Sequence, residues 1–226
     1  MSGVKNAREL TEGLMRRRGI QTVTHAAIQV VLADGRCFPF AYSMILPAFR
    51  GADFVRTSDL GNERGFLPVL PTLQHPRYPN IYGVGVAVHL DQPDKTPVPV
   101  GLPKSGQMTE AMAVVAAHNI AVALGAIPGP MQVPTLEALC FAEYGETGIG
   151  YVAAPVLPDP QTGQRRYAYA VQGVWVNWAK AVFEQYFLAK MRLGVGMPAM
   201  EKWGLRLLFG LELSQAVAPQ QQPAAS

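Results

Sequence analysis

At 226 residues, the chain is long enough to bury a sizeable core in one large domain or two small ones. Charged residues make up only 15% of it and hydrophobic residues 49%, so we expect apolar surface that a partner, a cofactor or a membrane covers. The net charge of +3 comes without a long basic block interleaved with aromatics, which excludes nucleic acid as an expected partner. Two cysteines make neither a disulfide framework nor a zinc cluster, and no metal site is predicted.

The first 75 residues predict a helix followed by a β-hairpin. Residues 4–18 fit an amphipathic helix, and this polar, helical start predicts no signal peptide. Residues 20–33, rich in Val, Ile and Thr, and residues 37–46 predict strands around a turn at Asp34-Gly35. Such a helix and hairpin form the second half of a Rossmann-type unit. We therefore expect residues 1–75 to be the remnant of a Rossmann-like, NAD-binding-type domain without its first strand and Gly-rich turn.

The middle of the chain predicts a ligand-facing helix N-terminus. Residues 81–87 read as a short buried strand ending in glycines, a type that meets ligands at its C-terminal edge. In residues 95–108, prolines alternate with apolar residues and hold the backbone extended up to a helix that begins near Gln107. Ser105 supplies a capping oxygen, so backbone N–H groups and a positive dipole end face an anion or an electron-rich ring. The alternative is an ordinary loop before an ordinary helix.

The last ninety or so residues predict a small antiparallel unit and two helices. No run reaches the ~18 apolar residues of a membrane-spanning helix, so membrane contact is expected at the surface only. The predicted elements are a hairpin over 136–143 and 149–155, a strand over 167–174, helices over 176–193 and 198–209, and a disordered Pro/Gln/Ala-rich tail from 216.

An ordered series of motifs resembles one protein family. The motifs are YPNIYGVGV at 78–86, KTPVP at 95–99, PKSGQMTE at 103–110, AHNI at 117–120, LCFAEYG at 139–145, AK at 179–180 and FEQYF at 183–187. To about residue 211, the chain is similar to the C-terminal half of bacterial-type sulfide:quinone oxidoreductases, which have the flavin disulfide reductase fold.

The resemblance implies an α/β fold: the C-terminal portion of a two-dinucleotide-binding-domain flavoprotein (FAD/NAD(P)-binding, Rossmann-like), with a C-terminal β/α region that faces the membrane. Residues 76–130 would be the flavin-contacting segment of the FAD domain, and residues 131–213 the region that associates with quinone and membrane. Residues 214–226 would be a disordered tail.

The resemblance also implies cofactor contacts. The backbone of Val86 would contact FAD, at a position where most relatives of the wider fold carry an aspartate. Lys104 and Gly106 would lie at the pyrimidine side of the isoalloxazine, where a helix N-terminus and a lysine stabilise an anionic reduced ring. Lys180, on an otherwise apolar helix, would lie beside flavin and quinone. A core strand residue at Val86 and a solvated lysine at Lys104 are the alternatives.

Cys140 matches the redox cysteine of the family, which lies over the flavin and exchanges sulfur with a second cysteine. This chemistry needs a thiolate, which a nearby positive charge or the flavin would favour by lowering the thiol pKa. Cys37 is interpreted as inert packing. Phe141 and Phe183 match aromatics that line the quinone ring, with ordinary core packing as the alternative. Met200 stands at the mouth of the quinone site, where relatives carry an aromatic, which leaves stacking there open.

Residues 198–211 place Trp203, Leu207, Leu208 and Phe209 between basic residues, as interfacial helices do. Docking on the chain's own core is the alternative. The family's monotopic attachment favours the membrane, so we expect a peripheral protein on the cytoplasmic membrane.

Taken together, the resemblance implies FAD-dependent oxidation of sulfide to polysulfide or sulfur, with electron transfer to membrane quinone, by the C-terminal half of the enzyme. FAD would be the cofactor, and a separate N-terminal half or a homo-oligomer would complete the site. Two alternatives stay open: a quinone reductase of the same fold that uses NADH or another donor, and a non-catalytic membrane-docking half that completes a partner's flavin site.

Overall fold

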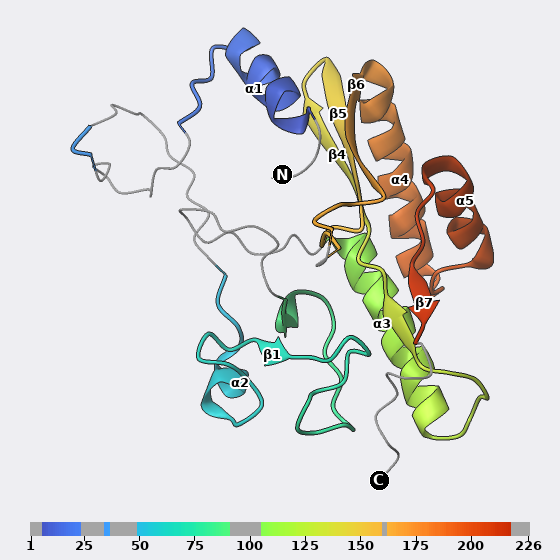
Figure 1. Cartoon of the computed structure of the whole chain (residues 1–226). Coiled ribbons are helices and arrows are strands. Elements are labelled where there is room, and N and C mark those ends of the chain that lie inside the picture. Colours follow the sequence, from blue (N-terminus) through green and yellow to red (C-terminus); the bar gives the residue numbers. More distant parts are fainter. Residues whose placement is uncertain (1–5, 24–33, 37–48, 91–104, 160–161, 218–226) are drawn as a thin grey trace.

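The computed structural model of the chain describes residues 6–23, 34–36, 49–90, 105–159 and 162–217 (Figure 1). Helices and strands are mixed along these segments, as the predicted α/β class requires. The elements in chain order are α1 (Ala7–Arg17), α2 (Asp53–Thr57), β1 (Leu67–Pro68), the 3-10 turn η1 (Gly85–Ala87), β2 (Val88–His89), α3 (Gly106–Ala123), β3 (Gln132–Pro134), β4 (Ala138–Tyr144), β5 (Thr147–Ala154), β6 (Tyr167–Gly173), α4 (Val174–Arg192), α5 (Ala199–Phe209) and β7 (Ser214–Ala216).

The largest sheet in the described residues is an antiparallel meander of β4, β5 and β6. The pairing of β4 with β5 extends to Tyr144 opposite Thr147, which leaves Gly145 and Glu146 as a two-residue turn. Gly145 has a φ of 72°. Tight hairpin turns need this left-handed backbone, which glycine adopts at no steric cost. The predicted hairpin is confirmed.

Helices cover both faces of this sheet (Figure 1). α4 follows β6 directly and contacts β4 and β5, whereas α1 packs on β5 and β6 from the other side. The hydroxyl groups of Thr11 on α1 and Tyr151 on β5 share a buried hydrogen bond of 2.6 Å. Around this bond the core consists of buried apolar side chains: Ala7, Leu14, Ile149, Tyr151 and Ala170.

α3 carries a second core and connects to the C-terminal helices. Its apolar side packs with the segment before it through Leu73, Val88, Met112, Val115 and Ala116. On α4, the buried ammonium of Lys190 binds Glu110 of α3 and Glu201 of α5, each at 2.7 Å. This three-residue ion cluster links the three helices. After α5, the chain turns at Gly210 and β7 pairs antiparallel with β3.

Two sequence-based expectations are wrong. The strand predicted over 81–87 is a short bridge between Tyr82 and Gln74 followed by η1, because Gly85 turns the chain with a φ of 63°. The tail expected to be disordered from residue 214 instead begins with β7, and Val217 is buried. The strand pairs with β3, a long-range contact that composition does not reveal. Of the predicted 20–46 hairpin, residues 24–33 and 37–46 lie outside the described residues.

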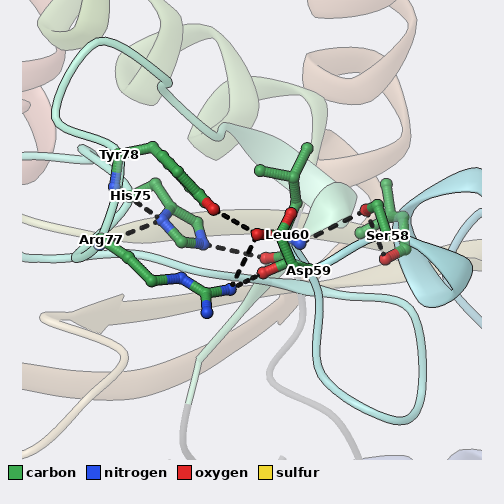
Figure 2. A network of polar contacts seen from close by, with 7 residues as sticks. Ser58, Asp59, Leu60, His75, Arg77 and Tyr78 are labelled. Carbon is green, nitrogen blue, oxygen red and sulfur yellow. Dashed lines mark hydrogen bonds and ion pairs between the residues drawn. The ribbon is translucent and has the colours of Figure 1, made fainter.

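A polar network holds the loop that leads to η1 (Figure 2). The Nδ1 atom of His75 accepts hydrogen bonds of 3.1 Å from the backbone N–H groups of Arg77 and Tyr78. Its Nε2 atom therefore carries the proton and donates to the carbonyl of Leu60 at 2.9 Å. The Tyr78 hydroxyl donates to the Asp59 carboxylate, which lowers the pKa of Asp59. The network thus ties the loop around Asp59 to the loop around His75.

Candidate functional site

The N-terminus of α3 is capped as the sequence predicts. Ser105 has an extended backbone, and its hydroxyl accepts a hydrogen bond of 3.3 Å from the N–H of Met108. Gly106 is the first helical residue, so its N–H has no acceptor within the helix and the positive dipole end lies at this point. Lys104, predicted beside it, lies outside the described residues.

This helix end opens into a groove of about 390 Å³ between α3, β4 and α4. Four residues predicted as cofactor or quinone contacts line it together, although they are distant in sequence: Gly106, Phe141, Lys180 and Phe183. The remaining lining residues are half polar and half apolar: Ser105, Gln107, Glu184, Leu139, Phe187 and Leu188. We call this space the α3–α4 groove.

Three aromatic rings form one wall of the α3–α4 groove. Phe183 and Phe187 are one turn apart on α4, and their rings stack with centroids 6.2 Å apart at 29°. Phe141 on β4 meets Phe183 edge to face, with centroids 6.4 Å apart. Gly150 lies opposite Phe141 on β5, so the residue paired with Phe141 adds no side chain beside this ring. Such a wall suits a flat, apolar ring system.

Gln107 is a groove residue that the sequence reasoning missed. Its side chain is buried, and its Oε1 atom accepts a hydrogen bond of 3.4 Å from the N–H of Leu139. Its Nε2 atom is buried and has no hydrogen-bond partner among the residues that the structure describes. An unpaired buried donor costs about 1–3 kcal/mol, which a ligand acceptor would offset. The signal was available, since Gln107 follows the capped Gly106 directly.

Lys180 reaches the α3–α4 groove as an ion pair. Its ammonium lies 2.6 Å from the carboxylate of Glu143 on β4, and both side chains are partly exposed. An exposed pair of this kind contributes at most about 1 kcal/mol, so a ligand anion can compete for the ammonium.

Cys140 lies on the opposite face of the sheet from the α3–α4 groove. Side chains alternate along β4, so Cys140 shares its face with its cross-strand neighbour Tyr151 and not with Phe141. The residue as a whole is exposed. Nevertheless, burial by the surrounding protein raises the pKa of its thiol, where the sequence led us to expect a lowered pKa. Cys37 lies outside the described residues.

Val86 and Met200 occupy different surroundings. η1 packs on the first turns of α3, where a Cβ on Gly85 would lie 2.6 Å from the Cγ2 atom of Thr109. Val86 is therefore beside this helix end and 51% exposed, on a turn and not on a strand. Met200 on α5 is 76% exposed and does not line the α3–α4 groove. The structure thus places Val86 near the N-terminus of α3, at the α3–α4 groove, and Met200 away from this groove.

Comparison with known proteins gives a consistent picture. No family model matches the chain. A curated sulfide-quinone reductase of Aquifex aeolicus (strain VF5) is 31% identical over 222 residues, which is 92% of this chain and 50% of that protein. The crystal structure of the sulfide:quinone oxidoreductase from the same hyperthermophilic species matches with a TM-score of 0.86 at 30% identity, over 99% of this chain and 54% of that one.

The predicted resemblance to the C-terminal half of a sulfide:quinone oxidoreductase is confirmed. The α/β fold is that of the C-terminal portion of this flavoprotein. The chain spans about half the length of the sulfide:quinone oxidoreductases it matches.

Two further observations concern the described residues. Across the ranges that the structure describes, no helix has the length and apolar character needed to cross a bilayer. The same ranges contain no cluster of His, Cys, Asp and Glu side chains that could hold a metal ion.

Proposed function

We propose that the chain is the quinone-reducing half of an FAD-dependent sulfide:quinone oxidoreductase, in which sulfide is oxidised to polysulfide or sulfur. The observation that carries this proposal is the α3–α4 groove. It gathers Gly106, Phe141, Lys180 and Phe183 from three separate elements around a capped helix N-terminus. The 31% identity to a sulfide-quinone reductase supports the same reaction class.

The α3–α4 groove fits FAD by the chemistry of its donors. The free N–H of Gly106, the unpaired Nε2 of Gln107 and the Lys180 ammonium would hold the polar edge of the ring system, with Lys104 next in sequence. The Val86 backbone would add a contact from η1. When bound, FAD supplies two-electron acceptance and transfer to quinone.

Cys140 would supply the sulfur chemistry. Sulfide attacks a disulfide between Cys140 and a second cysteine, the S–S bond breaks, and one sulfur leaves as a thiolate while the other becomes a persulfide. The thiolate then holds the electron pair that sulfide has given up, and this pair would pass to FAD and on to quinone. In this scheme the second cysteine comes from outside the chain, because Cys37 is interpreted as packing.

Quinone would approach through the C-terminal part. Phe141 and Phe183 offer ring faces and edges for an apolar quinone. The exposed apolar residues of α5 fit attachment to a bilayer surface, which we place at the cytoplasmic membrane. A separate N-terminal half or a second copy of the chain would complete the flavin site.

The test is reconstitution of the purified chain with FAD. We expect bound FAD to be bleached by sulfide and restored by a soluble quinone, and we expect Cys140→Ser to bind FAD equally but resist bleaching by sulfide. Unchanged bleaching in Cys140→Ser would end the sulfide interpretation. A chain that stays colourless with FAD would instead favour a non-catalytic docking half, since the chain spans about half of its relatives.

One observation favours a second candidate. Burial raises the pKa of the Cys140 thiol, which lowers the fraction of reactive thiolate. A quinone reductase of the same fold that takes electrons from NADH or another donor needs no cysteine. Bleaching of bound FAD by NADH in both the wild-type chain and Cys140→Ser would support this candidate.

A further inference from the structure

A second cavity lies further along α3, next to α5. It measures about 370 Å³ and is enclosed by α5, one side of α3 and the segment that follows α5. Its lining residues are Ala111, Val114, Val115, Met197, Lys202, Arg206, Leu211, Glu212, Leu213, Ser214 and Gln215. The lining of this cavity shares no residue with that of the α3–α4 groove. We call this second cavity the α5 pocket.

Two cations of the α5 pocket are not neutralised. Lys202 and Arg206 are one turn apart on α5, and neither forms an ion pair within the described part of the chain. The carboxylate of Glu201, which precedes Lys202 in sequence, pairs with the Lys190 ammonium instead, at 2.7 Å. The one carboxylate that lines the pocket, Glu212, lies 3.9 Å from a guanidinium nitrogen of Arg166. The pocket therefore keeps a net positive charge.

An exposed apolar face borders these cations. Met200, Trp203 and Leu207 follow the i, i+3, i+7 spacing of one helix face and are 76%, 70% and 68% exposed. Lys202 and Arg206 lie on the flank between this face and the buried side of α5, which Leu205 marks. A helix that lies on a bilayer by its apolar face carries such flanking cations at the level of the lipid headgroups.

We propose that the α5 pocket binds the phosphate of an anionic phospholipid, so that the chain docks preferentially on anionic bilayers. This inference rests on the membrane association proposed above and names the lipid class. The pocket offers Lys202 and Arg206 to the headgroup phosphate, and the adjoining Trp203 and Leu207 enter the acyl boundary. Charge complementarity selects this occupant, because a zwitterionic headgroup brings no net negative charge to the two cations.

The test is co-sedimentation of the full 226-residue chain with vesicles of phosphatidylcholine alone or mixed with phosphatidylglycerol. We expect clear preference for the mixed vesicles at moderate salt. Removing two surface cations lowers binding to an anionic membrane by about thirtyfold. Lys202→Gln with Arg206→Gln should therefore lose this preference by about that factor, and should bind phosphatidylcholine vesicles as the wild type does.

The matched control is Arg16→Gln with Arg17→Gln on α1. It removes the same charge from exposed residues on the other side of the sheet and should keep the preference. Equal binding to both vesicle types, or equal loss in the two double variants, would overturn the inference while leaving membrane association intact. Trp203→Ser with Leu207→Ser should weaken binding to both vesicle types. If the wild-type chain binds neither type, the proposed membrane association fails together with this inference.

Discussion

Cys140 and Phe141 are adjacent on β4, and their side chains lie on opposite faces of the sheet. Phe141 faces the α3–α4 groove together with Phe183, whereas Cys140 lies on the side of Tyr151 and α1. The backbone of β4 therefore lies between the Cys140 thiol and the aromatic wall of the α3–α4 groove. In the proposed enzyme, sulfur exchange and quinone binding would take place on different sides of β4.

This separation predicts that the two residues can be tested independently. Phe141→Ala removes the edge-to-face contact with Phe183, and such contacts contribute about 0.5–1.5 kcal/mol. We expect KM for quinone to rise about threefold to tenfold with little change in bleaching by sulfide. Cys140→Ser should give the reverse pattern. The exposed Phe54 provides the control Phe54→Ala. Equal effects of Phe141→Ala and Cys140→Ser on both readouts would contradict the separation.

Gln107 predicts a small effect on stability and a larger one on ligand binding. Gln107→Leu removes the buried Nε2, which has no partner among the described residues, and also the Oε1 acceptor of the long hydrogen bond from the Leu139 N–H; the two effects oppose each other, so the free energy of unfolding of the ligand-free chain should change by less than about 1 kcal/mol. Affinity for FAD should fall about tenfold through the lost hydrogen bond. Flavin fluorescence titration and urea unfolding measure the two quantities. Gln172→Leu, at an exposed position, is the control, and unchanged affinity in Gln107→Leu would show that its amide does not hold FAD.

The ion cluster of Lys190 predicts a large loss of stability on substitution. Lys190→Met leaves the carboxylates of Glu110 and Glu201 in the core without their cation, and should lower the free energy of unfolding by about 3–5 kcal/mol. Lys202→Met removes an exposed ammonium that has no ion pair within the described ranges and should change the free energy of unfolding by less than about 0.5 kcal/mol. Urea unfolding measures both variants. Similar losses in the two variants would show that the cluster adds no stability.

The same cluster predicts a pH dependence. Burial acts to lower the pKa of Lys190, but hydrogen bonds to Glu110 and Glu201 outweigh it and raise this pKa above its usual 10.5. A raised folded pKa means that the stabilisation is complete below the unfolded pKa and is lost as the pH rises through the folded pKa. Urea midpoints measured from neutral to strongly alkaline pH should fall more steeply above about pH 10 in the wild type than in Lys190→Met. Parallel curves would argue against the linkage.

The Thr11–Tyr151 hydrogen bond predicts non-additive substitutions. Burial raises the pKa of Tyr151 to about 12, so the phenol stays a neutral partner of Thr11 at ordinary pH. Thr11→Val removes one hydrogen bond of the Tyr151 hydroxyl, whose other partner is Tyr144, and should cost about 0.5–1.5 kcal/mol of unfolding free energy. Combining it with Tyr151→Phe removes both groups of this contact, and the double variant should lose less than the sum of the two single substitutions. Strict additivity in the double-mutant cycle would contradict a direct contact between α1 and the sheet.

Local sequence features determined the regular elements of this protein. The Ser105 cap and the apolar spacing after it predicted α3, and the alternation around Gly145 predicted the β4–β5 hairpin, because both depend on residues a few positions apart. The ordered motifs likewise predicted the relationship to sulfide:quinone oxidoreductases, with which the comparison agrees at 31% identity over 222 residues.

Only the tertiary structure decided how these elements meet. It placed Gly106, Phe141, Lys180 and Phe183 around one groove, although they are up to 77 positions apart, and left Met200 outside it. It also turned the Gly85 segment into η1, because the close approach of α3 at Thr109 leaves no room for a side chain there. Periodicity describes the faces of one element at a time. Which faces bury one another depends on long-range packing, and this packing builds the α3–α4 groove and the α5 pocket.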